Sequence, residues 1–222
     1  MEIKVMNKVL AANDAWAQEN RALLKKSGVL MVNLIGSPGA GKTALLEMTL
    51  EHLKGKLVAG VIEGDIATTR DAERIQKKGV PVCQINTGTA CHLDANLVNG
   101  AINQISGEVK FDIIFVENIG NLVCPAEFDI GEHAKIAVLS VTEGDDKIEK
   151  YPLLFSQARA LVITKMALHG FTNFDLARSQ VEFRKLNPSA PIFKVDSLKG
   201  EGVEPWIQFL VSMRRDAAGQ II

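Results

Sequence analysis

The segment GSPGAGKT, residues 36–43, constrains this chain more than any other part of its sequence. It fits the pattern G-x-x-x-x-G-K-[S/T], in which glycines let the backbone approach a polyphosphate and backbone N–H groups surround the anion. An apolar run at 29–36 precedes the loop, and a helical pattern at 43–56 follows it. This strand–loop–helix context is the one that the motif requires, so we expect a phosphate-binding loop in an α/β domain.

All eight residues of this loop are predicted to contact the nucleotide. They are Gly36, Ser37, Pro38, Gly39, Ala40, Gly41, Lys42 and Thr43. We expect the ammonium group of Lys42 to reach the β- and γ-phosphates and the hydroxyl of Thr43 to ligate Mg²⁺.

Apolar runs alternate with helical patterns along the rest of the chain. Strands are expected within 29–36, 57–65, 80–86, 111–120, 134–144, 158–165 and 190–202, and helices within 1–26, 43–56, 68–79, 93–106, 172–187 and 203–218. Such alternation predicts an α/β fold, a P-loop NTPase with a mostly parallel sheet and helices on both faces. We expect an N-terminal helical extension at 1–27, serving for packing or for docking through Trp16, and a nucleotide-binding domain with inserted metal-site loops at 28–222.

The charge balance argues against two classes of partner. The chain has 25 basic and 26 acidic residues, a formal net charge of −1, which gives no electrostatic footprint for nucleic acid or an anionic membrane. No apolar run approaches the roughly 20 residues that span a bilayer, and the N-terminus lacks an apolar signal core. We therefore expect a cytoplasmic protein, in which three cysteines favour metal binding or burial over a disulfide framework.

Two acidic residues follow apolar strands at the edge where parallel sheets bind ligands. Asp65 ends the run VIEGD and Glu117 ends the run IIFVE. We predict that both hold Mg²⁺ and act with Lys42 in catalysis, and that the segment TTRD at 68–71 responds to the γ-phosphate. The alternative is that each acid only begins a loop or caps a helix.

Cys91, His92 and Cys124 form a candidate metal site. Thiolate and imidazole suit Zn²⁺ and Ni²⁺, and three ligands leave a position open or shared across a two-fold axis. Cys91 is expected at the start of a helix, where its thiolate is favoured. Burial of Cys124 as a small apolar group and a capping role for His92 are the alternatives. Cys83, in the strand VPVCQIN, is predicted to lie in the core, and the other histidines on the surface or in loops.

A series of segments then resembles one known family. It comprises GSPGAGKT, EGDIATTRDAERI, QINTGTACHLDA, ENIGNLVCPAEFD, VTEGDDKIEKYP, FRKLNPSAP and KGEGVEPW, in this order. The series is similar to that of HypB, a family of GTPases that assist nickel insertion into [NiFe]-hydrogenase, and the similarity extends over residues 8–209. The pairing of ACHLDA with ENIGNLVCP is its most specific part.

The resemblance implies a slow GTPase that uses GTP and Mg²⁺ and binds Ni²⁺ or Zn²⁺ through Cys91, His92 and Cys124. It also implies a homodimer controlled by nucleotide, with the metal site near its interface. The implied partners are a HypA-type accessory protein and the large subunit of [NiFe]-hydrogenase. Lys147 and Lys150 either reach a neighbouring chain's phosphates or, the favoured interpretation, belong to a solvated charged loop.

The chain departs from the family at the base-reading motif. GTPases use Asn-Lys-x-Asp there, and the corresponding segment here runs from Thr164 through Lys165 to Ala167. Lys165 can lie against the base, but the carboxylate that selects guanine is missing, and the loss of such a partner weakens selectivity. Backbone donors from Ser197, Leu198 and Lys199 are expected to contact the guanine carbonyl. GTP is the nucleotide that the resemblance implies; the alternatives are a sister-family metallochaperone for urease or a cobalamin enzyme, or an ATP-using P-loop enzyme.

Overall fold

The computed structural model describes residues 4–65, 68–107 and 109–219, with the side chains of the first helix described from residue 11 onward. The strands are β1 (Leu30–Ile35), β2 (Ala59–Asp65), β3 (Val82–Asn86), β4 (Ile113–Glu117), β5 (Ala134–Ser140), β6 (Ala160–Thr164) and β7 (Ile192–Lys194). They form one sheet in the order β3-β2-β4-β1-β5-β6-β7, and every neighbouring pair is parallel.

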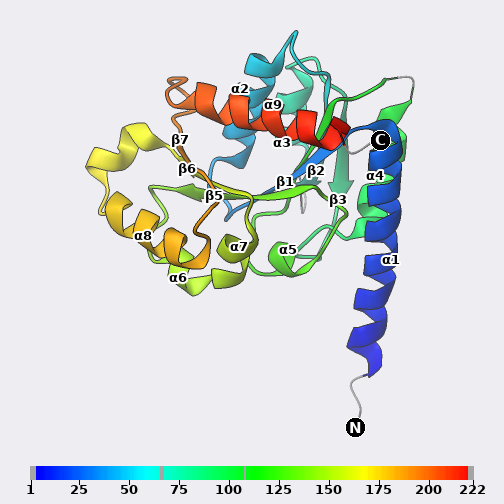
Figure 1. Ribbon diagram of the computed structural model, residues 1–222, viewed down its shortest axis with the longest axis horizontal. Helices are drawn as coiled ribbons and strands as arrows, with labels where there is room; N and C mark the ends of the chain where they lie inside the picture. The colour runs from blue at the N-terminus through cyan, green and yellow to red at the C-terminus, as the bar shows by residue number, and fades with distance from the viewer. Residues whose placement is uncertain (1–3, 66–67, 108, 220–222) are drawn as a thin grey trace.

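Helices cover both faces of this sheet (Figure 1). They are α1 (Lys4–Ser27), α2 (Lys42–Leu53), α3 (Arg70–Gln76), α4 (Ala95–Ser106), α5 (Cys124–Glu127), α6 (Lys147–Lys150), α7 (Pro152–Gln157), α8 (Leu176–Leu186) and α9 (Val203–Gly219), with the 3₁₀ helix η1 (Met166–Phe171). One face carries α2, α3 and α9, and the other carries α4, α5, α7 and α8 (Figure 1). The predicted P-loop fold with a mostly parallel sheet is therefore confirmed.

The central strand β1 explains why the run before the phosphate loop is apolar throughout. All six of its residues are buried, because helices pack on both sides of the sheet. Leu30, Val32 and Leu34 join the cluster under α2 and α9, while Met31 faces the opposite side. Strand β1 is therefore fixed on both faces, and the phosphate loop begins from a rigid base.

The N-terminal helix α1 lies beside α4 (Figure 1). Asn20 is fully buried, and its amide nitrogen donates to the carbonyls of Ala95 (2.8 Å) and Ile130 (3.0 Å). Asn13 accepts from the N–H of Ala95 (2.9 Å) and donates to the carbonyl of Asp129 (2.8 Å). Helix α1 thus packs against α4, which is one of the two roles considered for it. Residues 1–3 of the predicted helix lie outside the described part of the chain.

Several short helices appear where none was expected. They are α5, α6, α7 and η1, each of four to six residues. Segments this short do not display a helical period in the sequence. The charged loop expected around Lys147 and Lys150 is in fact the one-turn helix α6. None of the described helices has the length and apolar character needed to cross a membrane.

Candidate functional site: a phosphate pocket and a thiol–imidazole cluster

The phosphate loop lies at the carboxyl edge of the sheet, between β1 and α2. Gly39 and Gly41 have φ values of 78° and 85°, in the left-handed region where a side chain would be strained. A pocket of about 410 Å³ opens there, within the usual size of a ligand site. Its lining comes from the loop, from the ends of β2 and β4, and from α3.

Lys42 and Thr43 occupy the floor of this pocket and are buried. The Lys42 ammonium group donates to the carbonyls of Gly36 (3.2 Å) and Ser37 (3.3 Å). Both acceptors are backbone groups of the phosphate loop itself, which therefore keeps the ammonium group inside the loop. The Thr43 hydroxyl donates to Glu117 Oε1 at 2.8 Å. The structure therefore brings together three residues that were predicted to act on the triphosphate and Mg²⁺.

Glu63 and Glu117 form a buried pair of carboxyl groups beside Thr43. They are register partners on β2 and β4, and they are only 2% and 4% exposed. One oxygen of each, Oε2, has no hydrogen-bond partner among the described residues. Hydroxyl and carboxylate oxygens are the ligands that Mg²⁺ prefers, so this group of side chains fits that ion.

Burial controls the protonation of the pair. Removal from water, and then the charge of Glu117, raises the pKa of Glu63 to about 10. Burial likewise raises the pKa of Glu117 to about 7, although Lys42 and the Thr43 hydroxyl act in the opposite direction. Glu63 is not among the residues predicted from the sequence. The signal for it was alternation: Glu63 lies two strand positions before Asp65 and therefore on the same face.

Asp65 also lines the pocket, and its carboxylate binds Thr68, three residues further along the chain. Its Oδ2 accepts hydrogen bonds from the Thr68 hydroxyl (2.6 Å) and the Thr68 N–H (3.2 Å). Ile66 and Ala67, between Asp65 and the predicted switch segment 68–71, lie outside the described residues. Asp71 and Arg74 of α3 line the same pocket and are 2.8 Å apart in an ion pair. The side of the pocket formed by β2 and α3 therefore carries more charged side chains than the sequence motifs indicated.

The segment predicted to read the base contacts the phosphate loop. The Thr164 hydroxyl donates to the carbonyl of Ala40 (2.6 Å), and the Lys165 ammonium group donates to that of Gly39 (2.7 Å). Lys165 has a φ of 58°, which is uncommon for a residue with a side chain and directs the chain sharply after β6. These contacts place the segment after β6 directly against the loop.

The loop after β7 is held by Asp196. This side chain is 4% exposed and accepts three backbone hydrogen bonds, from Ala167 (2.8 Å), Leu198 (3.2 Å) and Lys199 (3.0 Å). Burial opposes its ionisation, but the three N–H donors prevail and lower the pKa of Asp196. Two of the N–H groups expected to face a guanine carbonyl thus already have an acceptor within the chain.

Cys91, His92 and Cys124 meet in a second cluster. The two sulfur atoms are 2.9 Å apart, and Cys91 Sγ lies 3.5 Å from His92 Nδ1. All three candidate ligand atoms fall within 4.8 Å of one another. Two thiols and an imidazole at this spacing fit a borderline or soft metal ion.

The surroundings of the cluster differ from the sequence expectation in one respect. Cys91 does not begin a helix: α4 starts at Ala95, where Asp94 caps it by accepting from the N–H of Leu97 (2.8 Å). The hydrogen bond with Cys91, followed by burial, raises the pKa of Cys124. Burial lowers the pKa of His92, whose ring lies 3.7 Å from that of Phe128, and so favours the neutral imidazole that metals bind.

A short polar chain joins the pocket to the cluster. Asn118 follows Glu117 and lines the pocket, and its Oδ1 accepts from the N–H groups of Ile119 (3.0 Å) and Leu93 (3.4 Å). Leu93 directly follows His92. One side chain therefore contacts both the pocket and the segment that follows His92.

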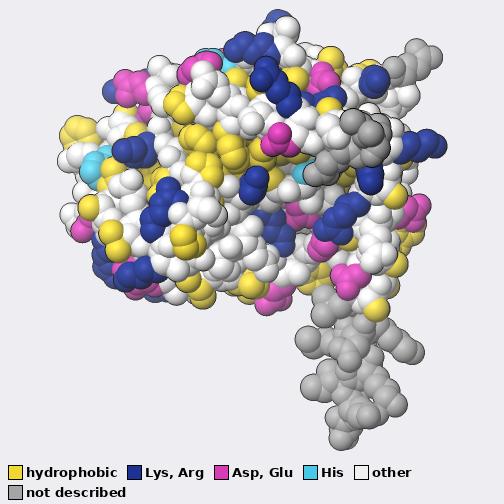
Figure 2. All heavy atoms as spheres, in the orientation of Figure 1, with side chains coloured by type: hydrophobic (Ala, Val, Ile, Leu, Met, Phe, Trp, Pro, Cys, Tyr) yellow, Lys and Arg dark blue, Asp and Glu magenta, His cyan; other side chains and the backbone are white. Residues whose placement is uncertain are grey.

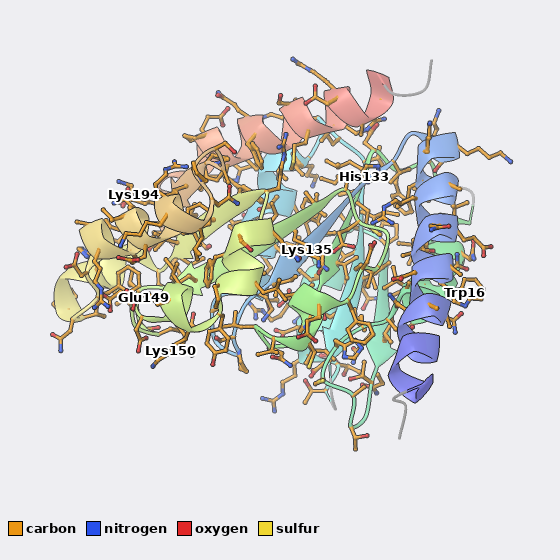
Figure 3. The ribbon with its side chains drawn as sticks, turned by 60° about the horizontal axis from the view of Figure 1, so that its bottom comes forward. Trp16, His133, Lys135, Glu149, Lys150 and Lys194 are labelled. Carbon is orange, nitrogen blue, oxygen red and sulfur yellow. The ribbon has the colours of Figure 1, made fainter. Side chains whose placement is uncertain are left out.

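Other candidates lie away from both sites. Cys83 is buried in β3, as predicted. Lys150 pairs with Asp146, and the Lys147 ammonium group lies 5.4 Å from the centre of the Tyr151 ring, so both lysines have local partners. Lys150 on α6 and Trp16 on α1 are at opposite sides of the molecule in Figure 3. On the face shown in Figure 2, basic and acidic side chains are interspersed.

The fold, the phosphate loop and the acidic pocket define a P-loop nucleotide-binding protein. Residues 30–194 match the family described as CobW/HypB/UreG, nucleotide-binding domain. The hydrogenase maturation factor HypB of Escherichia coli K12 is 43% identical over 214 residues, which cover 96% of this chain and 72% of that protein. The chain belongs to the HypB branch of the CobW/HypB/UreG family.

Two further comparisons agree. The hydrogenase/urease maturation factor HypB of Helicobacter pylori J99 is 40% identical over 218 residues, covering 97% of this chain and 89% of that protein. The crystal structure of Helicobacter pylori HypB in complex with nickel superposes with a TM-score of 0.88 at 39% identity. That match covers 92% of this chain and 96% of the solved one.

Proposed function

We propose that this chain is a GTP-hydrolysing metal-delivery factor for the maturation of [NiFe]-hydrogenase, acting in the cytoplasm. Its cargo is nickel, with Zn²⁺ as the competing ion, held by Cys91, His92 and Cys124. The relatives named as hydrogenase maturation factors, and the relative crystallised with nickel, support this assignment. The observation that carries it is the connection between the sites: Cys124 lies seven positions after Glu117, and Asn118 bonds to Leu93, the residue after His92.

The pocket residues have distinct proposed roles. The residues of the loop from Gly36 to Thr43 bind the phosphates, and Lys42 neutralises charge that develops on them. Thr43, Glu117 and Asp65 hold Mg²⁺, which supplies further charge neutralisation when bound. Thr164, Lys165 and the loop 197–199 surround the base.

The cycle that follows from these roles is a switch. A triphosphate engages the end of β4 and Asp65, and the segment 117–124 transmits the change to the cluster. The GTP-bound state favours a homodimer with the metal sites near its interface. A HypA-type accessory protein and the hydrogenase large subunit are the proposed partners.

The test measures metal and nucleotide together. Nickel affinity, by competition with a chromophoric chelator, is compared for the nucleotide-free protein and for its complex with Mg²⁺ and a non-hydrolysable GTP analogue. We expect the analogue to change nickel affinity in the wild type but not in K42A, because that variant lacks the buried ammonium group. Lys54→Ala, at an exposed residue directly after the same helix, is the matched control and should behave as wild type. Equal nickel affinity with and without the analogue in the wild type would refute the coupling.

A further inference from the structure

Two segments were predicted to surround the base: η1, after β6, and the loop after β7. They contain one buried carboxylate, at Asp196, and none at residue 167. Ala167 stands in the 3₁₀ helix η1, two residues after Lys165, whose ammonium group touches the phosphate loop. Its methyl side chain offers no hydrogen-bond acceptor. The Ala167 N–H donates to Asp196 at 2.8 Å, so this residue offers a base neither a side-chain acceptor nor a free backbone donor.

The carboxylate of Asp196 is engaged in holding the two loops together. Oδ2 accepts from Ala167, and Oδ1 accepts from both Leu198 (3.2 Å) and Lys199 (3.0 Å). A carboxylate oxygen has about two lone-pair directions, so Oδ1 is saturated. With 4% of the residue exposed, little of Asp196 is accessible to a ligand. Asp196 is therefore a positioning residue that ties η1 to the loop after β7.

This arrangement has a consequence for the nucleobase. Guanine presents two neighbouring donors, its N1–H and its 2-amino group, and an ionised carboxylate is the side chain that satisfies both. Hypoxanthine lacks the 2-amino group, and xanthine carries a carbonyl oxygen in its place. All three bases share the carbonyl oxygen at position 6, so they differ only at position 2.

We propose that this nucleotide site accepts 6-oxopurine nucleoside triphosphates without reading the substituent at position 2, because the side chain of residue 167 has no acceptor and the buried carboxylate of Asp196 binds the loops instead of the base. GTP, ITP and XTP are then nearly equivalent ligands. This inference deepens the proposed function and depends on its triphosphate binding.

The experiment compares affinities within one protein. Displacement of a fluorescent GTP analogue by GTP, ITP and XTP, with Mg²⁺ present, gives the ratio of dissociation constants. We expect ITP and GTP to differ by less than about fivefold, since a hydrogen bond to a charged group changes affinity by about tenfold or more. A larger preference for GTP over ITP in the wild type would overturn the inference.

Variants test the place of the carboxylate. The double variant A167D/D196S places a carboxylate at residue 167, and the serine hydroxyl retains an acceptor for the loop. We expect its preference for GTP over ITP to rise by about tenfold or more. A167S/D196S adds no carboxylate and is the matched control, with an unchanged ratio. If the ratio in A167D/D196S equals that of the control, while circular dichroism shows both variants folded, residue 167 does not face the base and the inference fails.

The outcomes for the inference and for the proposed function are distinguishable. If none of the three triphosphates binds, or if K42A binds them as tightly as the wild type, the proposed function is overturned and this inference with it. A strong preference for GTP over ITP, combined with loss of binding in K42A, overturns the inference alone.

Discussion

Glu63 and Glu117 make the stability of the unliganded protein depend on pH. Both carboxyl groups have an ordinary pKa of 4.5 when unfolded, and burial raises the folded values to about 10 and about 7. The folded chain keeps protons that the unfolded chain releases, so this contribution to stability is fully present below pH 4.5. It is lost as the pH rises through 7 for Glu117 and toward 10 for Glu63.

We therefore expect Glu63→Gln to flatten the fall in unfolding free energy between about pH 7 and 9, because glutamine keeps the shape of the protonated acid and cannot ionise. Urea unfolding at three pH values, without nucleotide or metal, measures the slope. Glu204→Gln, on the exposed side of α9, is the control and should retain the wild-type slope. Parallel curves for Glu63→Gln and wild type would contradict the prediction.

Cys124 and Cys83 differ in place although both are free cysteines. Cys124 lies 2.9 Å from Cys91 at the cluster, whereas Cys83 is buried in β3. Cys124→Ser should weaken nickel binding by about 10-fold to 100-fold, since the hydroxyl replaces a thiolate ligand that suits this ion. Cys83→Ala should leave the affinity unchanged. Equal effects of the two substitutions in a chelator competition would remove Cys124 from the proposed ligand set.

At the scale of elements, helix α1 anchors the segments that follow Cys91–His92 and Cys124. Asn20 binds the carbonyls of Ala95 and Ile130 and accepts from Asn99 Nδ2 at 2.8 Å. Ala95 lies four residues after Cys91, and Ile130 lies six residues after Cys124. The helix therefore fixes the relative position of two loops that are distant in sequence.

Removing this anchor should have two effects. Asn20→Ala leaves two buried carbonyls without donors and should cost about 2–4 kcal/mol of unfolding free energy. It should also weaken nickel binding by about tenfold, because the loops are no longer pre-positioned. Arg21→Ala removes only a half-exposed ion pair with Asp129 and should cost at most about 1 kcal/mol. Denaturant unfolding and chelator competition test both; wild-type nickel affinity in a folded Asn20→Ala variant would contradict the positioning role.

The same elements show what the sequence could predict. Long apolar runs and the spacing of the phosphate loop were sufficient for the parallel sheet and for the position of Lys42, because burial on both faces leaves a clear pattern. The pairing of Cys91 with Cys124 followed from chemistry and from the family resemblance. Glu63 was not predicted, because a single acidic residue inside an apolar run does not by itself indicate a functional site.

Other features required the three-dimensional structure. The buried role of Asp196 depends on hydrogen bonds to Ala167, 29 residues away, which no local pattern encodes. Asn20 is a polar residue on an amphipathic helix, where exposure is the usual expectation. Its burial follows from hydrogen bonds to residues far away in the sequence, which only the structure shows.

At the scale of the whole molecule, the proposed dimer can be tested through the surface beside the cluster. Val123, next to Cys124, is 46% exposed, and Leu97, early in α4, is 40% exposed. Apolar side chains beside the proposed metal site suit a contact between two copies, because a second copy would cover them and would complete the coordination of the ion. The net charge of −1 does not oppose association.

Val123→Asp should therefore shift the protein toward monomer when Mg²⁺, a GTP analogue and nickel are present, because a charge buried at the contact loses its water. Light scattering gives the mass of each variant at matched concentration. Val181→Asp changes a 55% exposed valine on α8, away from the cluster, and should dimerise as the wild type does. If Val123→Asp retains the wild-type mass, the dimer uses another surface; if the wild type stays monomeric under the same conditions, nucleotide and metal do not drive association. Equal losses in both variants would point to general damage, and only a loss confined to Val123→Asp supports an interface at the metal cluster.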